Sequence, residues 1–269
     1  FILGLAGVVN SYVAWGFVIA VVLWCSRDTK LIARDTLCRL RRAAGRVTPL
    51  GAAGAGLAFF AFLALFNVSQ LPPAEFDVLE YHLGLPAEYF RSGGTRPLAD
   101  NVFSFFPALY EMTALFLMQA ASGVLAGAML TKVLNVFLYM ALAAAVAAAA
   151  RRLWGRGAAL GGALIFFSLH IGFEITYKSY VENLLAFYAI LAIVALVFAL
   201  KSFLLDRRWL FLSAVSAGFA MGVKYTGVPF VLLPAVLVIA WVGVRRRLGV
   251  KQALARAFVY AAIASACAS

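Results

Sequence analysis

Carboxylates that could act as general acids or bases gather in one polar stretch, residues 71–106. Five of the chain's eleven Asp and Glu residues lie in it: Glu75, Asp77, Glu80, Glu88 and Asp100. Glu80, Tyr81, Gly84 and Glu88 follow Asp77 at spacings of 3, 4, 7 and 11 residues, which place them on one face of a helix. We therefore predict an amphipathic interfacial helix with its acids facing a cavity, and we expect Pro86 to kink it or to end its first half.

The same residues have a structural interpretation that stays open at this point. The run from Asp77 to Glu80 matches a capping box, in which Asp77 accepts from the first-turn amides and Glu80 reaches back to the chain. A carboxylate at the start of a helix can cap it and still take part in catalysis.

A second set of polar residues stands at the ends of apolar runs. Ionisable groups in or beside a membrane bundle are rare and often mark a site. The candidates are Lys178, Glu182, Asn183, Lys224 and Tyr225. Each lysine has an alternative, which is to extend its ammonium toward lipid headgroups. His82 falls on the apolar side of its helix, where a packing or hydrogen-bonding role is more common than metal ligation.

Motifs with a well-defined cofactor are missing. The sequence contains no zinc-ligand spacing, no P-loop, no GxSxG and no paired His motif. No cofactor is firmly indicated. The remaining possibility is a divalent cation, held by scattered carboxylates such as Asp77 and Glu182. The three cysteines suggest no disulfide framework.

The composition determines which elements position these residues. Apolar residues make up 65% of the chain and charged residues 13%, against about 25% charged in soluble domains, and the mean hydropathy is +0.96. The apolar runs are about 20 residues long, as membrane-spanning helices require, and lack the alternation of a membrane barrel. We therefore expect an all-α, polytopic transmembrane helix bundle. The net charge of +12 lies in discrete loops, so it does not indicate nucleic acid.

Hydropathy and charge together predict about seven spans in a single transmembrane domain, residues 1–269. Basic loops should be cytosolic, which puts residues 71–122 on the outer face, with residues 105–121 as a helix in the outer interface. Residues 1–50 give an extra first span and a cytosolic loop, residues 51–252 a core, and residues 253–269 the start of a further helix. We expect the sequence to be part of a longer protein. The predicted spans are 1–24, 51–67, 124–150, 158–173, 181–200, 209–223 and 228–244.

Four segments together resemble a known family. They are residues 76–82, which include Asp77 and His82; residues 101–111; residues 180–183, which include Glu182; and residues 218–227, which include Lys224. Their order resembles the lipid-dependent glycosyltransferases of the GT-C superfamily, particularly the protein mannosyltransferase-like and aminoarabinose-transferase-like branch of the family 39 type, over about residues 51–244. The chain departs from that family in its extra first span, its short length and a Glu where related sequences often have Asp.

The resemblance implies transfer of a sugar from a polyprenyl-phosphate donor to a lipid, glycan or protein acceptor on the periplasmic face of a bacterial inner membrane. It implies Asp77 as the catalytic base, with Glu80 or Glu182 as its electrostatic or metal partner. Lys224 or Lys178 would contact the phosphate. Tyr81, His82, Asn183 and Tyr225 would complete the substrate site.

Two other classes of protein remain as alternatives. One is a non-catalytic accessory subunit of a larger membrane complex, with the same fold and an unused site. The other is a transporter, which the sequence favours less because it shows no inverted repeat and no matching pair of broken helices.

Overall fold

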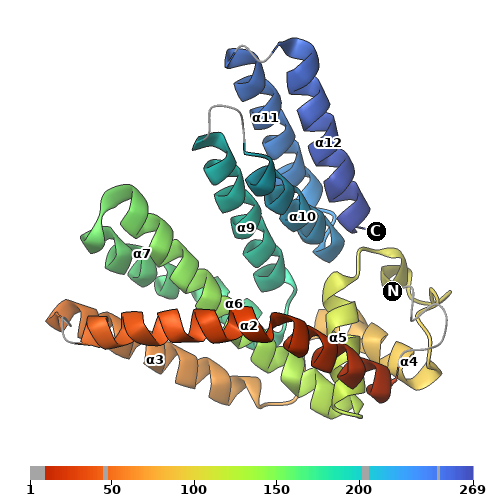
Figure 1. Ribbon diagram of the computed structural model, residues 1–269. Coiled ribbons are helices and arrows are strands. Elements are labelled where there is room, and N and C mark those ends of the chain that lie inside the picture. Colours follow the sequence, from red (N-terminus) through yellow and green to blue (C-terminus); the bar gives the residue numbers. More distant parts are fainter. Residues whose placement is uncertain (1–9, 45–47, 202–205, 247–248, 269) are drawn as a thin grey trace.

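The computed structural model describes residues 10–44, 48–201, 206–246 and 249–268, and all regular structure in this part of the chain is helical (Figure 1). An apolar chain satisfies its backbone hydrogen bonds most simply within helices, because lipid offers no partners. The elements are α2 (Ser11–Ala44), α3 (Pro49–Ser69), η1 (Val78–His82), α4 (Gly84–Ser92), η2 (Val102–Phe105), α5 (Leu109–Ala120), α6 (Val124–Trp154), α7 (Arg156–Ser168), α8 (His170–Lys178), α9 (Glu182–Lys201), α10 (Arg207–Val223), η3 (Val228–Leu232), α11 (Leu233–Arg245) and α12 (Val250–Ala268).

Four of these helices are long and apolar enough to cross a membrane, and they indicate a membrane protein. They cover Gly51–Ser69, Val124–Trp154, Glu182–Lys201 and Val228–Arg245. The predicted helical class and membrane character are thus confirmed in the described residues.

The predicted number of about seven spans is not confirmed. The segment predicted as one span over residues 158–173 is two helices, α7 and α8, bent by 62°. Leu169 between them has extended backbone angles, φ −74° and ψ 100°, which interrupt the helix. The apolar part of α2, Ser11–Ser26, is short for a span, and the first nine residues of the predicted first span lie outside the described residues.

Helices α9 to α12 pack together as one group (Figure 1). Their interface is rich in small residues, and Ala214, Ala217 and Ala220 of α10 are fully buried. A Cβ added to Gly218 would lie 2.4 Å from the carbonyl oxygen of Ala264 in α12. Small side chains therefore let these backbones approach closely, as membrane helices often do.

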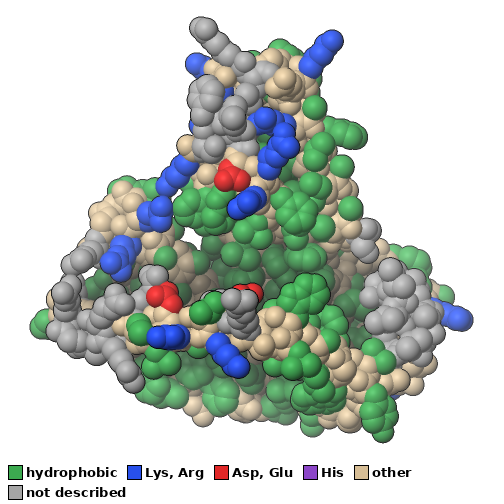
Figure 2. Space-filling view, in the orientation of Figure 1, with side chains coloured by type: hydrophobic (Ala, Val, Ile, Leu, Met, Phe, Trp, Pro, Cys, Tyr) green, Lys and Arg blue, Asp and Glu red, His purple; other side chains and the backbone are tan. Residues whose placement is uncertain are grey.

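The second group is built around α6, which packs against α3, α5, α7 and α8 and also against α9 of the first group. Helix α2 runs alongside and contacts α5. The space-filling view shows the molecule hollowed between the two groups, with hydrophobic side chains on the floor of the hollow (Figure 2).

Basic residues gather at one end of the helices, here called the basic end. Arg151 and Arg152 lie in the last turn of α6, Lys201 in that of α9 and Arg245 in that of α11. The Arg152 guanidinium lies 4.9 Å from the ring centre of Phe198 in α9, so the ends of α6 and α9 are neighbours. Figure 2 shows many of the Lys and Arg side chains along the upper and left tips of the molecule, with a few others on the lower front and at the right edge. The polar candidates of α9 and α10 lie at the opposite end.

Candidate functional site

Asp77 does not cap a helix, so the predicted capping box is wrong. Its backbone is helical, with φ −59° and ψ −35°, and its side chain makes no capping hydrogen bond. The first turn starts earlier, since Leu79 N–H donates to the carbonyl of Glu75 at 3.0 Å. The Asp77 carboxylate is therefore half-buried within the turn and not engaged with its amides.

The predicted single helix from Asp77 to Glu88 is interrupted. Residues Val78–His82 form a π-helical turn, closed by a 2.8 Å bond from Leu83 N–H to the carbonyl of Val78. The helix is interrupted at Leu83, before Pro86. Pro86 lies in the first turn of α4, where its missing N–H removes no helical hydrogen bond. The regular spacing from Asp77 therefore does not define one face, and Glu88 instead pairs with Arg91 on the surface.

The π-helical turn directs His82 into the interior. His82 is 2% exposed and its Nδ1 lies 2.7 Å from Oε1 of Glu111, which is 4% exposed and stands in the first turn of α5. Oε2 of Glu111 has no hydrogen-bond partner among the residues that the structure describes. The fold therefore buries a carboxylate with only one of its two oxygens hydrogen-bonded. The π-helical turn beside it is a second indication of a functional site, because such turns often occur there.

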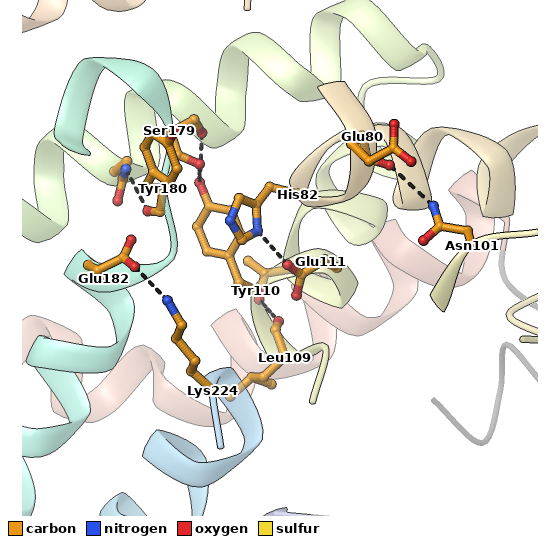
Figure 3. A network of polar contacts seen from close by, with 12 residues as sticks. Glu80, His82, Asn101, Leu109, Tyr110, Glu111, Ser179, Tyr180, Glu182 and Lys224 are labelled. Carbon is orange, nitrogen blue, oxygen red and sulfur yellow. Dashed lines mark hydrogen bonds and ion pairs between the residues drawn. The ribbon is translucent and has the colours of Figure 1, made fainter. Parts of the chain in front are cut away.

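An ion pair from the other helix group faces this pair. Glu182 begins α9, Lys224 follows the last residue of α10, and Lys224 Nζ donates to Glu182 Oε1 at 2.8 Å (Figure 3). Both side chains are half-buried. The ammonium of Lys224 is thus paired with a carboxylate of the protein, which differs from the predicted alternative of contact with lipid headgroups.

A cavity of about 220 Å³ lies between the two pairs. It is smaller than the roughly 300–1,000 Å³ of most ligand pockets, which suits a single ring rather than a whole lipid-linked molecule. The described residues that line it are Tyr81, His82, Phe103, Phe106, Pro107, Glu111, Val181, Val223, Lys224 and Tyr225. One carboxylate, one lysine and several aromatic rings thus face the same small space.

Tyr81 lies within the electrostatic influence of three carboxylates. Its ring stacks on Phe103 with a centroid distance of 4.2 Å. Burial, followed by the charges of Asp77, Glu111 and Glu182, raises the pKa of Tyr81 to about 12. The hydroxyl therefore stays protonated at physiological pH and can donate a hydrogen bond but not serve as a base.

Four of the predicted site residues line the cavity: Tyr81, His82, Lys224 and Tyr225. Glu182 joins them through Lys224. Asp77, Glu80 and Lys178 are not among the described lining residues, although the charge of Asp77 contributes to the raised pKa of Tyr81.

The remaining predicted residues have other surroundings. Glu80 is exposed and Figure 3 shows its carboxylate on the side of His82 away from Lys224. Lys178 lies 3.0 Å from Glu174 and 3.4 Å from Glu75, which replaces the predicted headgroup contact with ion pairs. Asn183 is buried and donates to Thr176 Oγ1 at 2.9 Å, a contact that stabilises the turn between α8 and α9.

Two groups important to the site were missed by the sequence analysis. Glu111 lay inside a segment that carried the family resemblance but received no role, although a lone carboxylate opening an apolar helix is a visible signal. Asn135 stands in the middle of α6, and its Nδ2 donates to the carbonyls of Ile175, Thr176 and Tyr180. A buried amide at this position fixes the turn that delivers Glu182, and its signal was a polar residue within an apolar span.

A larger cavity of about 500 Å³ lies between α10 and α12, near the basic end. It is lined by Arg207, Leu210, Phe211, Ala255, Arg256, Val259, Tyr260 and Ile263. None of these described residues is a carboxylate, so the chemistry that the sequence indicates belongs to the smaller cavity. Across the described part of the chain, no three His, Cys, Asp or Glu side chains are close enough to hold a metal ion together.

Comparison of the chain with protein-family models, with curated proteins and with solved structures finds no match.

Proposed function

We propose that this protein is a GT-C-type membrane glycosyltransferase that moves a sugar from a polyprenyl-phosphate donor to an acceptor hydroxyl at the 220 Å³ cavity. The observation that carries the proposal is the convergence of Glu111, Lys224 and an aromatic wall on this cavity. Glycosyl transfer requires a base for the acceptor and a cation for the leaving phosphate, and both kinds of group are within reach here.

Lys224 is the group best placed to bind the donor phosphate. It lies at the end of α10 and lines the cavity, while its ammonium can share its three donors between Glu182 and a phosphate oxygen. The rings of Tyr81 and Tyr225 form apolar walls suited to the face of a sugar. The hydrophobic hollow between the helix groups (Figure 2) would give the polyprenyl chain an apolar route.

Reaction in a single displacement would invert the anomeric carbon, because no covalent intermediate is formed. We place the site on the periplasmic side of a bacterial inner membrane, since it lies at the end opposite the basic helix turns.

The test uses the full-length protein in lipid nanodiscs with a panel of radiolabelled polyprenyl-phosphate sugars and a membrane lipid extract as acceptor. Wild type should release polyprenyl phosphate and label an acceptor. Lys224→Met should weaken binding of decaprenyl phosphate about tenfold or more, because a hydrogen bond to a charged group contributes about 1.5–3 kcal/mol. Lys251→Met, an exposed lysine at the basic end, is the matched control and should bind normally.

The alternative is an accessory membrane subunit, and the Lys224–Glu182 ion pair is compatible with it because a purely structural pair would have the same geometry. Native mass spectrometry separates the two functions. Stable copurification with a complex, together with no product and no decaprenyl-phosphate binding, would reject the glycosyltransferase and favour the subunit.

A further inference from the structure

We propose that Glu111 is the general base of the transfer and that His82 is its positioning residue, an inference that rests on the proposed function. It moves the role of base away from Asp77, the residue that the sequence suggested.

Glu111 is a buried carboxylate whose hydrogen bonding is incomplete. Glu111 is 4% exposed, and only its Oε1 has a partner, His82 Nδ1 at 2.7 Å. Its Oε2 finds none in the described part of the chain, where Glu182 Oε2 is the other buried carboxylate oxygen without a partner. An unpaired buried acceptor costs free energy, and of these two carboxylates Glu111 is the one that lines the cavity. An acceptor hydroxyl entering the cavity would supply the missing donor.

Glu111 also differs from the other candidate acids in its position relative to the cavity. Glu111 and Lys224 line the same cavity, from α5 and from the end of α10. Asp77 and Glu182 do not line it, and the Glu80 carboxylate is exposed on the far side of His82 (Figure 3). Glu182 is also paired with Lys224 already. Of these four acids, Glu111 is therefore the one placed to contact a hydroxyl held in the cavity opposite Lys224.

The imidazole of His82 is held firmly by aromatic neighbours. Its ring lies between Tyr81, Tyr110 and Tyr180, with centroid distances of 4.0, 5.9 and 5.8 Å. Tyr110 is itself fixed by its hydroxyl, which contacts Ser179 Oγ at 2.6 Å. A rigid imidazole bonded to one carboxylate oxygen orients the other oxygen, which is the arrangement of a base and its orienting partner.

The acceptor hydroxyl gives its proton to Glu111 Oε2 while its oxygen forms a bond to the anomeric carbon. The bond between that carbon and the phosphate oxygen breaks, and its electron pair stays on the phosphate. Polyprenyl phosphate leaves with one more negative charge, which Lys224 faces, and Glu111 later loses its proton to water.

The test compares Glu111→Gln, Glu111→Asp, Glu111→Ala and Asp77→Asn with Glu88→Gln, a surface carboxylate of the same loop, as control. Glu111→Gln should lower kcat by about 100-fold or more, the usual contribution of a general base, with decaprenyl-phosphate binding unchanged. Glu111→Asp should keep part of the activity. Formate should restore turnover to Glu111→Ala, an effect that a merely structural carboxylate would not show. Glu88→Gln should behave as wild type.

His82→Gln supplies a second readout if the Glu111 variants fold poorly. It should lower kcat and leave the Kd for decaprenyl phosphate unchanged, since the imidazole acts through Glu111. A full loss in Asp77→Asn with normal turnover in Glu111→Gln would overturn this assignment and leave the proposed function standing. Absence of transfer and of decaprenyl-phosphate binding in wild type would overturn both.

Discussion

At the scale of single residues, the ammonium of Lys224 would interact with two anions in the proposed reaction. Glu182 holds its ammonium at 2.8 Å, and the donor phosphate would compete for the same charge. The pair is half-buried, so its strength is that of a largely solvated ion pair. The balance between the two anions should therefore be adjustable by a single substitution.

Glu182→Gln should tighten decaprenyl-phosphate binding by up to about fivefold, because it removes a competitor worth about 0.2–1 kcal/mol. Equilibrium binding in nanodiscs measures the effect, and Glu174→Gln, which releases Lys178 instead, is the matched control. Weaker binding in Glu182→Gln would show that Glu182 orients Lys224 and does not compete with the phosphate.

Several polar residues of the site, though not Glu111, could be predicted from the sequence, but their partners could not. Lys224, Glu182 and His82 stand out because ionisable groups are rare in so apolar a chain. Glu182 and Lys224 are 42 positions apart, and His82 and Glu111 are 29 apart. Such pairings depend on how the helices pack, so no local spacing rule could reveal them.

At the scale of elements, the π-helical turn η1 determines where the residues of the polar loop point. Periodicity predicted a continuous helix because it assumes 3.6 residues per turn. The extra residue of the π turn and the break at Leu83 change the register, so that His82 is buried and Glu80 is exposed. Gly84 accommodates this turn because it has no Cβ to collide with the carbonyl of Leu79, five residues earlier, and apolar periodicity does not report that requirement.

Gly84→Ala should destabilise this junction. A Cβ at Gly84 would lie 2.0 Å from the carbonyl oxygen of Leu79, a backbone atom that can move only if the turn opens. We expect a loss of about 1–3 kcal/mol of stability, as for other overpacked sites. Denaturation of the protein in detergent measures it, and sugar transfer should fall with it because His82 would shift.

Gly56→Ala is the matched control for that variant. An added Cβ at Gly56 in α3 meets nothing within 4 Å, so the change should be neutral or stabilising through helix propensity. Equal stability of Gly84→Ala and wild type would show that the turn tolerates a side chain, and η1 would then not be what fixes His82.

At the scale of the whole molecule, the helices alternate between two ends although they differ in length and straightness. Helix α6 finishes at the basic end beside α9, and Glu182 at the start of α9 lies at the other end. The bent pair α7 and α8 therefore leads the chain from the basic end to the other end. Helix α10 repeats this return, since it leads from the basic end to Lys224, the partner of Glu182. Charge at the turns predicts that the two ends lie on opposite sides of the membrane, whereas the 62° bend was not predictable because no Pro or Gly occupies position 169.

This alternation predicts on which side of the membrane each end lies. The positive-inside rule places the basic turns in the cytosol and therefore Glu88, in α4, on the opposite face. In a variant without Cys25, Cys38 and Cys267, an impermeant maleimide should label Glu88→Cys in intact cells and Lys251→Cys only after permeabilisation. Both test positions are exposed, so burial cannot explain a difference in labelling. Labelling of Lys251→Cys in intact cells would invert the topology, and the cavity would then face the cytosol. The polyprenyl-linked donor would then have to be available on the cytosolic side. The proposed substrate therefore depends on which side of the membrane the cavity faces.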